Sequence, residues 1–130
     1  MFIIMYDNIE LTDTENIGTP QVQMRLKPNL PKELIPLGLF ENSETESMFK
    51  AMNWFCDRVF PEERVDCKEL LEDLGLDRYD PWEIVKLTRG TLMTDGWWLK
   101  VHSTDTYEKH SLRGAAGYPA KSFESKKSYR

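Results

Sequence analysis

The stretch that decides the fold runs from Asp57 to Trp98 and reads DRVFPEER at 57–64, LLEDLGL at 70–76, YDPWEIV at 79–85 and DGWW at 95–98. It combines helix-start signals, helix-stop signals and large aromatic side chains. We therefore expect the chain to build a compact domain around this stretch.

Its first predicted helix begins at Pro61 or at Asp66, because Asp66 and Glu69 form a capping box. Gly75 is typical of the residue that ends a helix. The buried face of this helix is expected to carry Leu70, Leu71 and Leu74.

The second helix has the clearest start. Asp80 can accept hydrogen bonds from free backbone N–H groups, Pro81 suits the first helical position and Glu83 complements the positive helix end. We expect Gly90 to end it.

A third helix is predicted before this stretch. Ser43 and Glu46 form a capping box, and apolar residues recur at helical spacing from Met48 onward. This helix is expected to end near Phe60, because a proline follows it.

Strand signals lie on both sides of these helices. Residues 2–6 and 9–11 flank Asp7 and Asn8, which predicts a short hairpin or a bent strand, and residues 22–26 alternate apolar and polar side chains. Asp95 and Gly96 are typical of a two-residue hairpin turn between 91–94 and 97–101. The sequence thus predicts an α+β fold, in which a small antiparallel sheet of N-terminal strands and a 91–101 hairpin packs with about three short helices.

The 130-residue chain is long enough for one hydrophobic core, and no apolar run approaches the roughly 20 residues of a spanning helix. The apolar start lacks a basic region and stops at Asp7, so it is not typical of a signal peptide. Cys56 and Cys67 then indicate reduced thiols and a cytoplasmic protein. We expect one α+β domain over residues 1–110 and a basic, flexible tail over residues 111–130.

The formal net charge of −5 is unevenly distributed. Residues 113–130 carry five basic residues against Glu124 alone, a net charge of +4, so residues 1–112 carry −9. An acidic body disfavours duplex DNA as the main partner and suits a basic protein surface. Simple solubility is the alternative explanation.

No arrangement of residues typical of catalysis is found in the sequence. The two cysteines and two histidines lack metal-ligand spacing, and neither a serine elbow nor a phosphate-binding glycine loop occurs. We interpret the carboxylates Glu62, Glu63, Asp66, Glu69, Glu72 and Asp73 as one solvated helix face. We expect no enzyme activity, no cofactor and no metal, although an enzyme whose residues are not recognised stays open as a third hypothesis.

The helices predicted over residues 66–90 have the outline of a helix-turn-helix. Their second helix offers only Lys86 and Arg89 as basic side chains, and Trp82 and Glu83 stand at the end that would enter the groove. A small DNA-binding regulator is therefore the alternative function. Aromatic residues interleaved with lysines in the tail could also stack on single-stranded bases.

Arginines and aromatics supply the candidate contact residues. Trp97 and Trp98 point to opposite faces of a strand, so one of them is expected to lie on a surface or in an interface. Arg58 and Arg64 flank a helix corner, where they can pair with carboxylates or recognise an anion. The candidate binding residues are Arg58, Arg64, Trp82, Trp97, Trp98, Tyr118 and Phe123.

The pattern over residues 20–100 resembles small uncharacterised proteins of Gram-positive bacteria and their mobile elements, and the short module that precedes the kinase domain in some HipA-like proteins. It is carried by DRVFPEER, the Leu70–Leu71 pair, YDPWEIV and DGWWLK, and PKELIPLG at 31–38 is similar to a segment of the same group. The resemblance implies a phage or mobile-element setting and a stand-alone accessory module. Kinase activity is not implied, because nucleotide-binding segments have no counterpart.

We therefore expect a non-catalytic protein-binding module of a phage or mobile element. Its expected role is to occupy, and so to inhibit or modulate, a host or defence protein with a basic surface. No membrane partner is expected.

Overall fold

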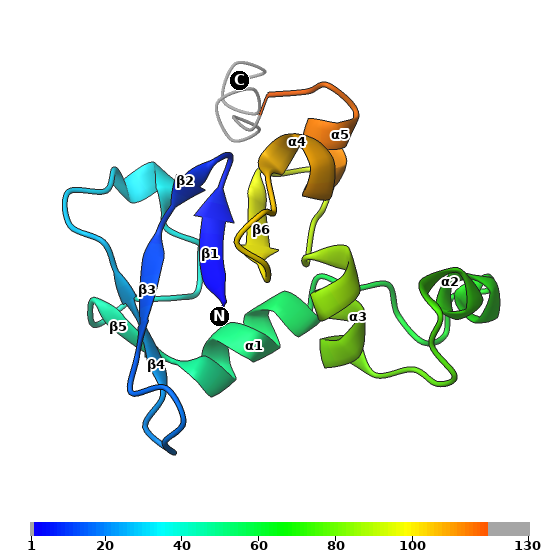
Figure 1. Cartoon of the computed structure of the whole chain (residues 1–130), viewed down its shortest axis with the longest axis horizontal. Coiled ribbons are helices and arrows are strands. Elements are labelled where there is room, and N and C mark those ends of the chain that lie inside the picture. The colour runs from blue at the N-terminus through cyan, green and yellow to red at the C-terminus, as the bar shows by residue number, and fades with distance from the viewer. Residues whose placement is uncertain (1, 120–130) are drawn as a thin grey trace.

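The computed structural model describes residues 2–119 and confirms the α+β class (Figure 1). Two small antiparallel sheets pack with the helices α1 (Met48–Cys56), α2 (Cys67–Leu74) and α3 (Pro81–Thr88). Shorter helical turns are η1 (Lys32–Leu34), α4 (Tyr107–His110) and α5 (Leu112–Ala115).

The first sheet joins the two ends of the domain. It contains β1 (Ile3–Tyr6), β2 (Ile9–Glu10) and β6 (Trp97–Lys100) in the order β2-β1-β6. The β1–β2 hairpin turns at Asp7 and Asn8 as predicted, with Asp7 in the left-handed region at φ 56°. In the register of β1 with β6, Met5 lies opposite Trp98.

The predicted 91–101 hairpin is wrong. Strand β6 pairs with β1, whereas residues 91–94 form coil and turn. The Asp95 carboxylate accepts a hydrogen bond from the Trp97 N–H at 3.1 Å and also pairs with Arg58. The turn at Asp95 and Gly96 therefore directs the chain into β6, which lies beside β1. On its other edge β6 donates one hydrogen bond, from the Leu99 N–H to the carbonyl of Arg89, the residue that caps the end of α3, at 2.8 Å.

The second sheet contains β3 (Thr12–Glu15), β4 (Gln23–Leu26) and β5 (Thr45–Ser47) in the order β3-β4-β5. Strand β4 confirms the alternating pattern at 22–26. The capping box at Ser43 and Glu46 is wrong, because Glu46 belongs to β5 and its carboxylate accepts the Phe40 N–H at 2.9 Å. Helix α1 begins later, capped by Ser47, whose hydroxyl accepts the Lys50 N–H at 3.2 Å.

The core lies where β1 and β6 meet α1 and α3. Ile4, Phe55, Val85 and Trp98 are at most 1% exposed and belong to one apolar cluster. Helix α1 ends at Cys56, four residues before the predicted end, and the following residues turn toward the α2 segment.

The predicted end of α2 at Gly75 is confirmed, and α3 is capped by Arg89, one residue before the predicted Gly90. The predicted start of α2 at Asp66 is confirmed as well, but the capping box with Glu69 is wrong, because the Asp66 side chain makes no cap bond. Gly75 closes α2 in the left-handed region, and Leu76 N–H donates to the Leu71 carbonyl at 2.9 Å. Asp80 caps α3 through Trp82 N–H at 3.1 Å, and the helix ends at Thr88, just before Arg89 and Gly90, which both have positive φ.

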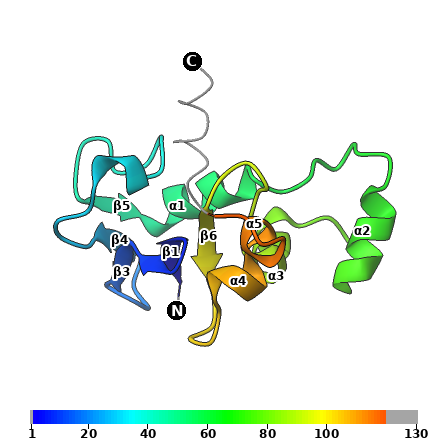
Figure 2. The same ribbon diagram turned by 90° about the horizontal axis from the view of Figure 1, so that it is seen from above.

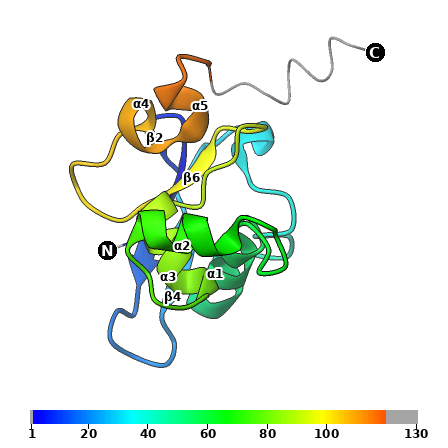
Figure 3. The ribbon, with the colours of Figure 1, turned by 90° about the vertical axis from the view of Figure 1, so that its right-hand side faces the viewer.

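Helices α4 and α5 lie together beyond one end of the first sheet (Figures 1 and 3). Gly114 of α5 sits so close to Tyr107 of α4 that a Cβ atom there would lie 2.1 Å from the Tyr107 carbonyl oxygen. Ser111 between them is buried. The tail predicted from residue 111 therefore begins with packed residues, and its remainder from residue 120 lies outside the described residues.

Candidate interaction surface

Residues 61–80, with α2 at their centre, form what we call the α2 arm. Figures 1 and 2 both place α2 at the far end of the molecule from the two sheets. The leucines predicted to be buried, Leu70, Leu71 and Leu74, are only half-buried, and Cys67 is the buried residue of the helix. The arm thus packs loosely against the body on its apolar side.

The α2 arm concentrates the negative charge of the chain. Residues 62–77 contain seven carboxylates against Arg64 and Lys68, a net charge of −5 that equals the formal charge of the whole chain. Of these seven carboxylates, only that of Asp66 has an ion pair among the described residues, with its Oδ1 2.6 Å from Arg64 Nε. The predicted solvated face is confirmed for Glu62, Glu63, Glu69, Glu72 and Asp73, whereas its sixth member, Asp66, is half-buried. Asp77, which was not predicted, is also exposed.

Arg58 is a structural residue in this fold. Its guanidinium donates to both oxygens of Asp95 at 2.9 and 2.7 Å, to the Gly90 carbonyl at 2.7 Å and to the Trp97 carbonyl at 2.9 Å. It also lies over the Trp54 ring at 4.7 Å, and its side chain is 8% exposed. These bonds fasten the 90–97 loop to the end of α1, so little of the guanidinium faces solvent.

Arg64 differs from Arg58 in exposure. Its side chain is 53% exposed at the base of the α2 arm, and its pair with Asp66 is equally open to solvent. Exposed pairs of this kind contribute roughly 0–1 kcal/mol, so Arg64 can exchange its carboxylate partner at small cost. Of the two predicted arginines, Arg64 is the one available to a partner.

The tryptophans divide between core and surface. Trp98 is 0% exposed and donates its indole N–H to the Asp7 carbonyl at 2.8 Å, so this candidate has no surface to offer. Trp97 on the opposite face is half-buried and donates to the Leu34 carbonyl at 2.8 Å. Trp82 is half-buried beside Phe2, with ring centroids 5.2 Å apart. The expectation that only one of Trp97 and Trp98 enters the core fully is confirmed.

Of the two tail candidates, Tyr118 is described and Phe123 lies outside the described residues. Tyr118 is 56% exposed, lies 5.7 Å from the Arg113 guanidinium and accepts the Tyr107 hydroxyl through its carbonyl at 3.0 Å. Tyr118 is therefore a surface aromatic beside α5, distant in sequence from the α2 arm.

A second arginine-centred network was not predicted. Asp105 is 4% exposed, and its carboxylate accepts Arg89 Nε at 2.7 Å and the backbone N–H groups of Val101 and His102 at 3.0 Å. Burial alone would raise the pKa of Asp105, but these hydrogen bonds outweigh it and hold that pKa well below its usual range. The partners are 16 residues apart, a spacing that no local pattern signals.

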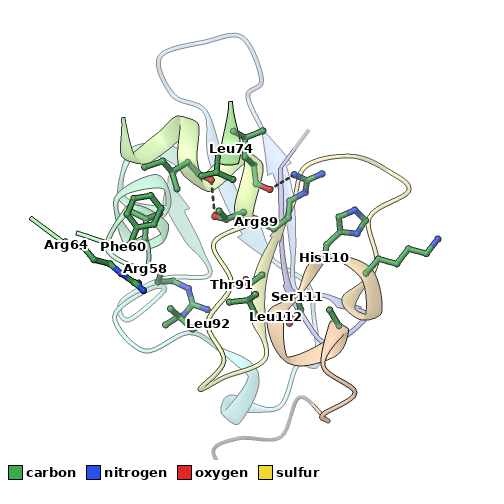
Figure 4. Close-up of a pocket in the computed structure, with 16 residues that line it drawn as sticks. Arg58, Phe60, Arg64, Leu74, Arg89, Thr91, Leu92, His110, Ser111 and Leu112 are labelled. Atoms are coloured by element: carbon green, nitrogen blue, oxygen red, sulfur yellow. Dashed lines mark hydrogen bonds between the residues drawn. The ribbon is translucent and has the colours of Figure 1, made fainter. Parts of the chain in front are cut away.

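A cleft of about 530 Å³ opens beside this network (Figure 4). One side is formed by α3, another by α4 and α5, and Leu74 of α2 reaches it from the arm. Leu87 and Leu112 line it and are 47% and 51% exposed. Its apolar lining residues are Val59, Phe60, Leu74, Ile84, Leu87, Leu92, Leu112 and Ala115.

His110 lines the cleft, whereas the two cysteines do not. His110 Nε2 lies 3.4 Å from Asp105 Oδ1, and His110 Nδ1 accepts the Thr106 N–H at 3.1 Å, which occupies both ring nitrogens. Burial is the main cause that raises the pKa of Cys56 and of Cys67, which disfavours their reactive thiolate forms. No cluster of metal-ligating side chains occurs within residues 2–119.

The helix-turn-helix alternative gains no support from this geometry. Ile84 and Val85 of α3 are fully buried, and Trp82 at its start packs against Phe2. Lys86 is paired with Glu83, Nζ to Oε2 at 2.5 Å. A reading helix needs basic and amide side chains free to enter the groove, and the adjoining α2 arm is strongly acidic.

No helix in the described part of the chain is long and apolar enough to cross a membrane. Comparison with family models gave no match, and searches of curated proteins and of solved structures gave none either.

Proposed function

We propose that the protein is a non-catalytic protein-binding module whose α2 arm contacts a basic surface of a partner protein. The observation that carries this proposal is a projecting α2 arm with six exposed carboxylates, three of them on α2 itself, that have no ion pair among the described residues. Within a folded chain such a concentration of like charge is destabilising by self-repulsion. A basic partner would remove that repulsion on binding.

The arrangement suits electrostatic recognition. Exposed charges of one sign steer an oppositely charged partner and raise its association rate, mainly at low ionic strength. The half-buried leucines on the inner side of α2 provide apolar area beside the charged face. An apolar centre with a charged rim is the usual composition of a protein–protein interface.

The biological setting is part of the proposal and rests on the sequence resemblance. A phage or mobile element that carries a small acidic module would use it to occupy a host or defence protein and so inhibit or modulate it. The expected partner surface is rich in lysine and arginine. Occupation of such a surface needs no reaction and no cofactor.

The test compares two charge-reversal variants in affinity purification from Gram-positive host cells, with quantitative mass spectrometry. The arm variant is Glu69→Lys/Glu72→Lys/Asp73→Lys. The control is Glu33→Lys/Glu41→Lys/Glu44→Lys, which changes the net charge equally at exposed positions elsewhere. We expect the arm variant to recover at least about tenfold less partner than the wild type, and the control to recover a similar amount.

Three outcomes contradict the proposal. The wild type could recover no stoichiometric protein, the two variants could lose the partner equally, or neither could lose it. Duplex DNA is titrated in parallel at low salt, because affinity that falls steeply with salt would favour the DNA-binding alternative.

A further inference from the structure

We infer that the cleft between α3 and α4–α5 is a second docking site, which takes a segment of a partner protein with apolar anchor residues flanked by carboxylates. The site goes beyond the proposed function, because its charge is opposite to that of the α2 arm.

The apolar part of the cleft is open to solvent. Leu87 on α3 and Leu112 on α5 are each about half exposed, at 47% and 51%, and both face the same cavity. The cavity of about 530 Å³ lies within the range of roughly 300–1,000 Å³ that ligand-binding clefts occupy. A side chain such as leucine or phenylalanine that enters the cleft would cover both leucines.

The charged lining has one sign. The sixteen residues around the cleft include Arg58, Arg64, Arg89, Lys109 and His110 and no aspartate or glutamate. This is unexpected in a chain with a formal net charge of −5. The cleft is thus a cationic region on an acidic protein.

Of the three arginines and the lysine, Arg58 and Arg89 are held in partly or fully buried pairs, while Lys109 and Arg64, the latter in an exposed pair with Asp66, are accessible. The side chains of Arg58 and Arg89 are 8% and 12% exposed in their pairs with Asp95 and Asp105. Arg64 is 53% exposed, and Lys109 is exposed with no carboxylate of the described residues within 4 Å of its Nζ. In Figure 4, Arg64 lies at the left of the pocket and His110 at the right. Lys109 is the chain neighbour of His110.

This distribution favours a peptide segment over a small anion. The guanidinium groups of Arg58 and Arg89 have their main donors engaged, so no pre-formed arginine fork is left for a single carboxylate or phosphate. The accessible cations come from separate segments, and apolar residues make up half of the lining. A segment with central apolar anchors and acidic flanks matches both features, as a rim of charge around an apolar centre does in protein interfaces.

The test is a selection of random 16-residue peptides, displayed on phage, against the purified full chain. Enriched peptides should contain one or two large apolar residues and an excess of aspartate and glutamate. Each enriched peptide is then synthesised, and its Kd is measured by fluorescence anisotropy. Two cleft variants, Leu112→Glu and the pair Arg64→Glu/Lys109→Glu, should each raise that Kd at least tenfold.

The controls separate this site from the α2 arm. Leu37→Glu alters a leucine that is 89% exposed and does not line the cleft, and it should leave the Kd within twofold. The arm variant Glu69→Lys/Glu72→Lys/Asp73→Lys should do the same. Circular dichroism of every variant checks the fold, and the Arg64→Glu/Lys109→Glu pair keeps the test valid if Leu112→Glu unfolds.

The inference is overturned if no peptide is enriched above an unrelated protein, or if the cleft variants leave every Kd unchanged. It is also overturned if enriched peptides are basic and lose affinity in the arm variant, which would leave the proposed function standing. A titration with sodium decanoate covers the small-molecule case, and its binding in the cleft without any enriched peptide would refute a peptide site.

Discussion

Arg58→Ala should destabilise the protein far more than Arg64→Ala, although both arginines flank the same helix corner. Arg58 makes four hydrogen bonds within the fold, and its loss would leave the Asp95 carboxylate, 16% exposed, without its cation. Removal of one partner of a buried pair costs roughly 3–5 kcal/mol. Because Asp95 keeps some contact with water, we expect about 3 kcal/mol, near the lower end of that range.

The free energy of unfolding is measured by urea denaturation and the Tm by thermal denaturation, both monitored by tryptophan fluorescence. For a chain of this length a loss of about 3 kcal/mol lowers Tm by roughly 10 °C. Arg58→Lys keeps the charge but not the planar fork, so its loss should be intermediate. Arg64→Ala, whose pair is exposed to solvent, should change the free energy of unfolding by at most about 1 kcal/mol.

A double-mutant cycle of Arg58→Ala with Asp95→Ala tests the pair itself. The two residues are in direct contact, so their effects should be non-additive by roughly 0.5–3 kcal/mol. If Arg58→Ala stays within about 1 kcal/mol of the wild type, the range expected for an exposed pair, the Arg58–Asp95 pair does not stabilise the fold as a buried pair. Equal losses in the Arg58 and Arg64 variants would refute that stabilisation as well.

Three further predictions concern the caps, a glycine and pH. Asp80→Ala should cost about 1 kcal/mol of unfolding free energy, while Asp66→Ala, whose side chain makes no cap bond, should cost at most about 0.5 kcal/mol. Gly90→Ala should lower the free energy of unfolding in urea by about 2–4 kcal/mol, because its Cβ would lie 2.5 Å from the Phe55 ring on a left-handed backbone. Gly75→Ala has the same backbone strain but no atom within 4 Å of its Cβ, so its loss should be about 1 kcal/mol. Equal losses would contradict this. The pKa of Asp105 is lowered from 3.8 by hydrogen bonds that outweigh its burial, so its stabilisation is complete above that value and is lost as the pH falls below it. The stability difference between wild type and Asp105→Asn should therefore shrink from about pH 6 to about pH 2, and a constant difference would refute the assignment.

Helix α3 shows how much local sequence can determine. Its cap, its first residue and its end are set by Asp80, Pro81 and the Arg89–Gly90 pair, all within one turn of the helix ends. The Asp7–Asn8 hairpin and the end of α2 at Gly75 were predictable for the same reason. In each case the decisive hydrogen bonds join residues that are neighbours in the chain.

Two of the errors arose where distant partners outweighed a local signal. Asp95 and Gly96 favour a hairpin, but Arg58, 37 residues away, holds the Asp95 carboxylate, and β1 takes the strand that follows. Ser43 and Glu46 match a capping box, but pairing with β4 makes residues 45–47 a strand. A local capping signal stabilises a conformation by about 1 kcal/mol. Breaking a buried ion pair costs more than that, so a distant partner can override the local signal.

The sequence by itself determined the class of fold, most helix ends and the concentration of charge at residues 62–77. Only the tertiary structure decided what that charge and the aromatics do. It placed Trp98 in the core, turned Arg58 inward onto Asp95 and left α2 projecting from the body. It also brought segments between residues 58 and 115 together around a cationic cleft, which no sequence spacing predicts. The physical reason is that a charge or a helix cap depends on one residue or one turn of the chain. The exposure of a side chain and its pairing depend on which distant segments the core packs together.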